Sequence, residues 1–126
     1  MTQNTSSKYG RLLVIEPDPL LRWSLTTYFS RWYEVCEAQD EAVAQGAIEQ
    51  GGIDALIVAD ALGDAANRLV TSAKEGNAVV AVIRTVTRLP DATHAEDGIH
   101  FVEKPFQLSR LAELLGITSA NMRRNA

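Results

Sequence analysis

The chain has 126 residues, of which 46% are apolar, and a net charge of −4. This length suits one domain with its own core, and the composition argues against a wholly disordered chain. The negative charge argues against direct nucleic-acid binding, which needs a clustered basic face. No apolar run approaches the ~20 residues of a membrane span, and residues 1–8 lack a signal-peptide core. The single cysteine, Cys36, allows no internal disulfide and suits a buried, inert thiol, so we expect a reducing, cytoplasmic setting.

Short apolar or alternating runs predict five strands, and apolar residues at helical spacing predict the helices between them. The predicted strands cover residues 12–15, 33–38, 53–58, 78–83 and 99–102. The predicted helices begin at Asp18-Pro19, Asp40, Asp64 and Leu108 and end near Trp32, Gly51, Gly76 and Gly116. Residues 84–97 predict a loop with at most a short helix. We expect a disordered leader at 1–9, a domain at 10–117, and a tail or the start of a linker at 118–126.

This alternation predicts an α/β fold, with a parallel sheet covered by helices on both faces. In such sheets the functional groups lie beyond the carboxyl ends of the strands. Three strand ends should therefore converge. Their sequences are Glu16-Pro17-Asp18, Ala59-Asp60 and Glu103-Lys104-Pro105-Phe106.

Lys104-Pro105-Phe106, directly after a strand and before a leucine-striped helix, is the most specific local motif. With it, residues 12–21, 54–64 and 101–106 resemble the receiver domain of bacterial two-component response regulators. The resemblance extends from Arg11 to about Gly116. It implies a three-layer, flavodoxin-like fold with five parallel strands in the order 2-1-3-4-5. It also implies a phosphorelay signalling role without enzymatic turnover, and a cis peptide bond before Pro105.

In that family, an aspartate that ends the third strand accepts a phosphoryl group from a histidine kinase. An acidic pair after the first strand binds Mg²⁺, and the lysine before the proline binds the phosphoryl oxygens. A serine or threonine that ends the fourth strand and an aromatic residue on the fifth respond to the transfer. The chemistry needs a carboxylate nucleophile, and cations that offset the charge on the phosphoryl oxygens.

This sequence departs from the family pattern at the positions that carry the chemistry. Alignment places Ala59, which has no nucleophile, at the phosphoacceptor position. Glu16 fits the first metal-binding position, but Pro17 replaces the second, and Asp18 falls one residue late and suits a helix cap better than a metal ligand. We therefore expect no metal, unless Asp60 replaces the missing acceptor through a one-residue bulge and Mg²⁺ binds beside it.

The residues that surround the phosphoryl group in the family are partly retained. Lys104 and Pro105 match, and Phe101 keeps the aromatic ring without a hydroxyl. The family hydroxyl should lie near Ile83, so Thr85 fits only with a shift of two residues. We expect these residues to be remnants of the switch.

A lysine without a phosphoaspartate needs another anion, because an unpaired charge taken out of water is costly. Two acidic side chains end neighbouring strands and can supply it. We expect either a Glu16–Lys104 or an Asp60–Lys104 pair that holds one conformation.

The leading hypothesis is a receiver-like domain that has lost aspartyl phosphorylation and acts as a protein-interaction module. Its docking face would comprise Thr85, Phe101, Lys104, Gln107 and Arg110, without contact to nucleic acid or membrane. The partner would be a second copy, an output domain or another signalling protein.

Two alternatives remain. The first is a working receiver, phosphorylated at Asp60 by a histidine kinase. The second is a flavodoxin-like module that binds an anion or a nucleotide between Glu16, Asp60 and Lys104. The second is weak, because no glycine-rich phosphate loop follows any strand.

Overall fold

The computed structural model describes residues 9–89 and 98–117, and in them strands and helices alternate along the chain. The elements are β1 (Arg11–Ile15), α1 (Pro19–Phe29), β2 (Glu34–Ala38), α2 (Glu41–Gln50), β3 (Ala55–Ala59), the 3₁₀ turn η2 (Asp60–Leu62), α3 (Asp64–Gly76), β4 (Ala81–Val86), β5 (Ile99–Glu103) and α4 (Leu108–Leu114). All strand pairs are parallel, and the order is β2-β1-β3-β4-β5. The predicted fold class and strand order are confirmed.

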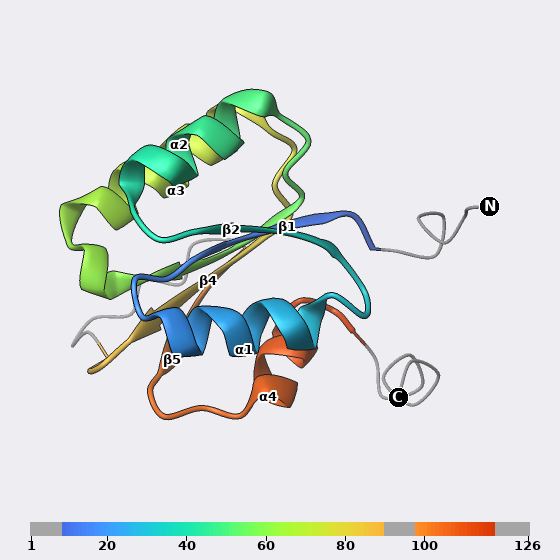
Figure 1. The fold of residues 1–126 in the computed structure, drawn as a ribbon, viewed down its shortest axis with the longest axis vertical. Helices are drawn as coiled ribbons and strands as arrows, with labels where there is room; N and C mark the ends of the chain where they lie inside the picture. The colour runs from blue at the N-terminus through green and yellow to red at the C-terminus, as the bar shows by residue number, and fades with distance from the viewer. Residues whose placement is uncertain (1–8, 90–97, 118–126) are drawn as a thin grey trace.

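The sheet lies between two helical layers (Figure 1): α1 and α4 cover one face, and α2 and α3 cover the other. Every residue of β3 is buried, as is typical of a central parallel strand. The strands send alternate side chains to the two faces, so each face has its own core. Ile57 and Ile83 pack toward α1 and α4, whereas Leu56 and Val82 pack toward α2 and α3.

Two aspartates cap helices as predicted. The Asp18 carboxylate accepts backbone N–H groups of Leu20 at 3.0 Å and Leu21 at 3.4 Å, and Pro19 opens α1. The Asp40 carboxylate accepts the N–H of Val43 at 3.0 Å. Because these bonds satisfy backbone groups that a helix start leaves unpaired, they fix where each helix begins.

The fourth strand lies three residues later than predicted. Residues 78–80 of the apolar run precede the strand: the Val80 side chain is exposed, and its N–H is bonded to the carbonyl of Asp54, just before β3. The strand continues instead through Arg84 and Thr85, and its pairing with β5 ends at Val86. This shift determines the geometry of the candidate site. The remaining predicted segment, 90–97, lies outside the described residues.

One further predicted boundary, the end of the first helix, is corrected. Helix α1 ends at Phe29, and Trp32 is buried just beyond it. Tyr9, assigned from the sequence to the leader, packs its ring 5.7 Å from that of Tyr33 and donates its N–H to the carbonyl of Trp32. Residue 9 of the predicted leader is thus in contact with the segment before β2, while 1–8 and 118–126 lie outside the described residues. Within the part of the chain that is described, no helix has the length and apolarity to cross a membrane.

Candidate functional site

The end of β3 lies beside β4 at the carboxyl edge of the sheet, where Ala59 pairs with Thr85. Both are almost fully buried, at 1% and 2% exposure. Their side chains point to the face that α1 and α4 cover, because Ile57 and Ile83, two residues earlier on each strand, pack there. The sequence placed Ile83 near the hydroxyl position and Thr85 two residues away. The later position of β4 corrects this and brings Thr85 level with Ala59.

The Thr85 hydroxyl has no hydrogen-bond partner among the described residues. An unsatisfied buried polar group costs about 1–3 kcal/mol. The neighbouring methyl group of Ala59 cannot accept a hydrogen bond. The Thr85 hydroxyl is therefore buried at a position where no described residue accepts or donates a hydrogen bond to it.

The Glu16 carboxylate, 3% exposed, has both oxygens engaged. One oxygen accepts the N–H of Asp18 at 2.9 Å, and the other lies 3.4 Å from the ammonium of Lys104. The first of the two expected lysine pairs is thus present. The peptide bond between Lys104 and Pro105 is cis, as the resemblance implied.

Asp60 is bound by arginine rather than by Lys104. Its Oδ1 lies 2.8 Å from Nε and 2.6 Å from Nη2 of Arg84, whose Nη1 donates to the Asn67 side chain at 2.7 Å. Arg84 precedes Thr85 on β4, so it points to the opposite face of the sheet. The sequence analysis missed Arg84 because it lay in the segment predicted as a loop. The second expected pair, Asp60–Lys104, is replaced by this contact.

These residues do not fit a magnesium ion. Mg²⁺ requires oxygen ligands in near-octahedral geometry. Glu16 already binds Lys104, Asp18 caps α1, and Asp60 binds Arg84, while Pro17 and Ala59 offer no side-chain oxygen. Across residues 9–89 and 98–117, no three His, Cys, Asp or Glu side chains form a group that could hold a metal.

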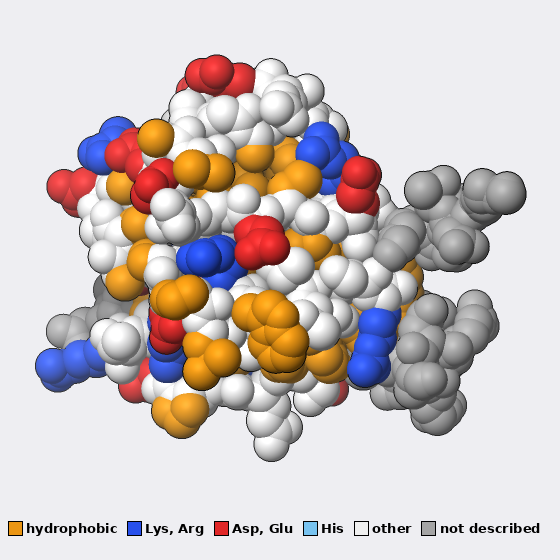
Figure 2. All heavy atoms as spheres, viewed as in Figure 1, with side chains coloured by type: hydrophobic (Ala, Val, Ile, Leu, Met, Phe, Trp, Pro, Cys, Tyr) orange, Lys and Arg blue, Asp and Glu red, His pale blue; other side chains and the backbone are white. Residues whose placement is uncertain are grey.

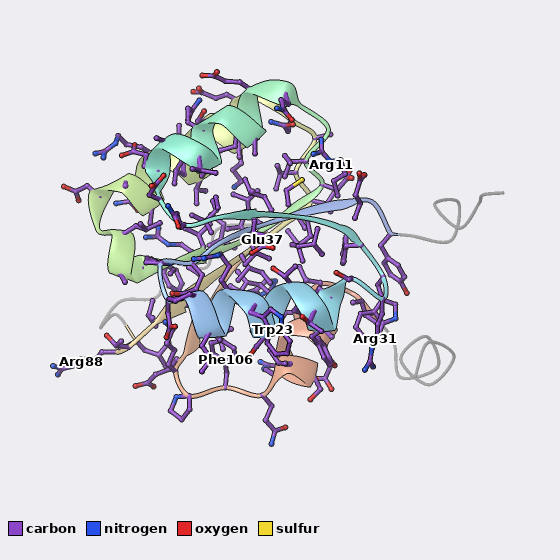
Figure 3. All side chains as sticks on the ribbon, viewed as in Figure 1. Arg11, Trp23, Arg31, Glu37, Arg88 and Phe106 are labelled. Carbon is purple, nitrogen blue, oxygen red and sulfur yellow. The ribbon has the colours of Figure 1, made fainter. Side chains whose placement is uncertain are left out.

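A cavity of about 210 Å³ remains at this edge of the sheet. Its lining includes Asp60, Thr85, Arg88 and Lys104. Arg88 lies just beyond β4, which ends at Val86, and Figure 3 shows it at the periphery of the molecule. The cavity brings together two of the three residues expected to bind an anion, Asp60 and Lys104.

The residues of the expected docking face differ in exposure. Phe101 is half-buried, Gln107 and Arg110 are exposed, and Lys104 is half-buried. Thr85 is buried, so the structure removes it from any surface that a partner can touch directly.

An exposed apolar surface on α1 was missed by the sequence analysis. Leu20 and Trp23 are 72% and 63% exposed, beside a groove of about 500 Å³ that Leu21, Pro105 and Phe106 help to line. Apolar side chains gather there over α1 (Figure 2), and Trp23 and Phe106 lie together on this side of the molecule (Figure 3). Helical periodicity could have predicted that Leu20 and Trp23 are exposed. Neither residue lies on the helix face that buries Leu25 and Phe29.

Comparisons with known proteins identify the fold through structure and not through sequence. No protein-family model matches the chain, and no curated protein sequence matches it. A response regulator receiver domain protein from Bacillus halodurans has 24% identity and a TM-score of 0.66, over 82% of this chain and 92% of that one. The magnesium-bound receiver domain of a sensor histidine kinase from Pseudomonas aeruginosa has 20% identity and a TM-score of 0.67, over 84% and 93%.

A response regulator from Burkholderia pseudomallei with a phosphorylated aspartic acid has 19% identity and a TM-score of 0.69, over 92% of this chain and 72% of that one. At these identities the likeness establishes the fold alone. The chain has the fold of response regulator receiver domains.

Replacement of Thr85 by valine should stabilise the protein by about 1 kcal/mol, because it removes an unsatisfied buried hydroxyl. Thr85→Ser is the matched control: it keeps the hydroxyl, loses a buried methyl group and should destabilise by roughly 1 kcal/mol. Urea unfolding followed by circular dichroism measures both. A destabilising Thr85→Val would show that the hydroxyl is bonded in solution.

Proposed function

We propose that this chain is a receiver-like signalling domain of a two-component response regulator that does not use aspartyl phosphorylation. The single observation that carries the proposal is the burial of Ala59, paired with Thr85, at the end of the central strand. A phosphoryl acceptor must be a nucleophile, and the methyl group of Ala59 has no lone pair with which to attack. The receiver fold and the retained Lys104-Pro105 pair support the wider signalling role.

The contacts of Asp60 argue against its use as a replacement acceptor. Phosphoryl transfer to a carboxylate needs a metal ion near the reacting oxygens, and an arginine bound to the carboxylate offsets the charge that makes it a nucleophile. In this structure Asp60 forms a short ion pair with Arg84 on one side of the sheet. The carboxylates that could hold a metal beside it, Glu16 and Asp18, are engaged elsewhere.

Signalling by docking, in a cytoplasmic setting and without enzymatic turnover, is the remaining mode for such a domain. Its partner is a protein: a second copy, an output domain or another signalling protein. The expected face, with Phe101, Gln107 and Arg110, offers a half-buried ring and exposed polar groups. The α1 surface adds the exposed Leu20 and Trp23, and exposed apolar side chains beside a groove are typical of protein contacts.

The alternative anion-binding module receives partial support. Lys104 and Asp60 do line one cavity. However, Lys104 is already paired with Glu16 and Asp60 with Arg84, so the remaining cation of the cavity lining is the exposed Arg88. We therefore favour docking.

Treatment with acetyl phosphate and Mg²⁺ should leave the mass of the protein unchanged, because no free carboxylate occupies the acceptor position. Intact-protein mass spectrometry measures this, and a receiver domain with an aspartate at that position, treated in parallel, verifies the reagent. A phosphoryl adduct that disappears in Asp60→Asn would establish Asp60 as the acceptor and contradict the proposal.

A designed metal site tests the account of the acidic pair. Ala59→Asp alone should not create measurable Mg²⁺ affinity, because Glu16 remains bound to Lys104 and Pro17 offers no ligand. Ala59→Asp together with Pro17→Asp should bind Mg²⁺ more tightly than either single variant by isothermal titration calorimetry. If Ala59→Asp alone binds as tightly as the double variant, the missing ligand is not at position 17.

A further inference from the structure

Arg84 connects three elements at the edge of the sheet. Its guanidinium binds Asp60 at the turn after β3 and Asn67 on α3, and it lies over the Phe101 ring on β5, 5.4 Å from the ring centre. The side chain is only 14% exposed. No motif in the sequence singled this residue out.

The contacts of Arg84 use the particular geometry of a guanidinium. Its planar fork presents several N–H donors in fixed directions while the flat face remains free for an aromatic ring. Here Nε and Nη2 are directed to Asp60, and Nη1 to Asn67. A cation over an aromatic face contributes about 0.5–2 kcal/mol. The position of the ring is therefore tied to the same group that holds the turn.

Asp60 and Phe101 have no shared strand pairing. Strand β4 lies between β3 and β5, so the two residues are separated by roughly 10 Å, twice the spacing of neighbouring strands. Arg84 extends from the middle strand to both. The three contacts are present together in a domain without a phosphoryl group.

We propose that Arg84 is a positioning residue that couples the turn at Asp60 to the Phe101 ring and so holds the β5 edge in one docking-ready arrangement. This inference rests on the proposed function, in which docking replaces a covalent switch. In this proposal, the contact between Arg84 and Phe101 forms without phosphorylation and replaces a contact that would form only after it. A partner that binds at Phe101 then meets a ring already fixed by the interior of the domain.

The test follows the Phe101 ring by NMR in protein labelled with ¹³C at phenylalanine. The chain has three phenylalanines, so the ring signals are assignable. Asp60→Asn and Arg84→Met should each shift the Phe101 ring signals, and the double variant should show the same shift as Arg84→Met alone. Such non-additivity requires that Asp60 acts on the ring through Arg84.

Glu41→Gln provides the matched control. It weakens an ion pair of the same chemistry, in which Arg68 contacts both Glu41 oxygens at 2.9 Å, between α2 and α3 and without contact to β5. It should leave the Phe101 signals in place. Arg84→Lys keeps the charge but not the fork, and should lose the coupling as Arg84→Met does.

Additive shifts at Phe101, or an Asp60→Asn variant whose Phe101 signals match those of the wild type, would overturn the coupling. If Arg84→Met does not fold, Asp60→Asn alone decides, since it must still move the ring. Failure of this test leaves the phosphorylation assay untouched, so the two proposals can fail separately.

Discussion

The pairing of β3 with β4 determines which side chains reach the functional edge of the sheet. Ala59 lies level with Thr85, and Arg84 precedes Thr85 on the same strand. Side chains alternate along a strand, so a shift of one residue would exchange the faces of Arg84 and Thr85. Both features of the site, the buried methyl group and the Asp60–Arg84 ion pair, follow from this one register.

The second constraint is that three carboxylates near this edge, Glu16, Asp18 and Asp60, already have donors from the protein. Glu16 binds the Asp18 N–H and Lys104, the Asp18 carboxylate caps α1, and Asp60 binds Arg84. Of the three, only Glu16 has both oxygens engaged, so its recruitment by a metal would require the loss of an existing bond. A buried carboxylate such as Glu16, left without its lysine, would be strongly destabilising. The charges of the site thus stabilise a single arrangement and favour docking over chemistry.

The parts of the fold that local sequence controls could be predicted. The apolar runs of β1 and β3, the caps at Asp18 and Asp40, and the Lys104-Pro105 step depend on residues close together in the chain. The end of β4 could not be predicted, because Arg84 and Thr85 break the apolar run that marks the strand. Whether a polar residue extends a strand depends on the neighbouring strand and on partners far away in sequence.

The site shows the same division. The expectation that Ala59 occupies the acceptor position came from the resemblance to receiver domains, which aligns residues 54–64 with the family pattern. The partner of Asp60 could not be inferred, since Arg84 is 24 residues away and its side chain is placed by the register of the sheet. Helical periodicity could have predicted that Trp23 is exposed. It could not have predicted the groove beside Trp23, because Pro105 and Phe106, which line the groove, are far away in sequence.

The most direct test of the account is a titration with beryllofluoride, a mimic of the phosphoryl group, and Mg²⁺, followed through the amide NMR spectrum. If the acceptor position is filled by a methyl group and Asp60 stays with Arg84, the amide signals of Glu16, Asp18, Ala59 and Asp60 should not move. Saturable shifts of those signals that disappear in Asp60→Asn would show that the Asp60 carboxylate binds beryllofluoride. That result would contradict the central claim.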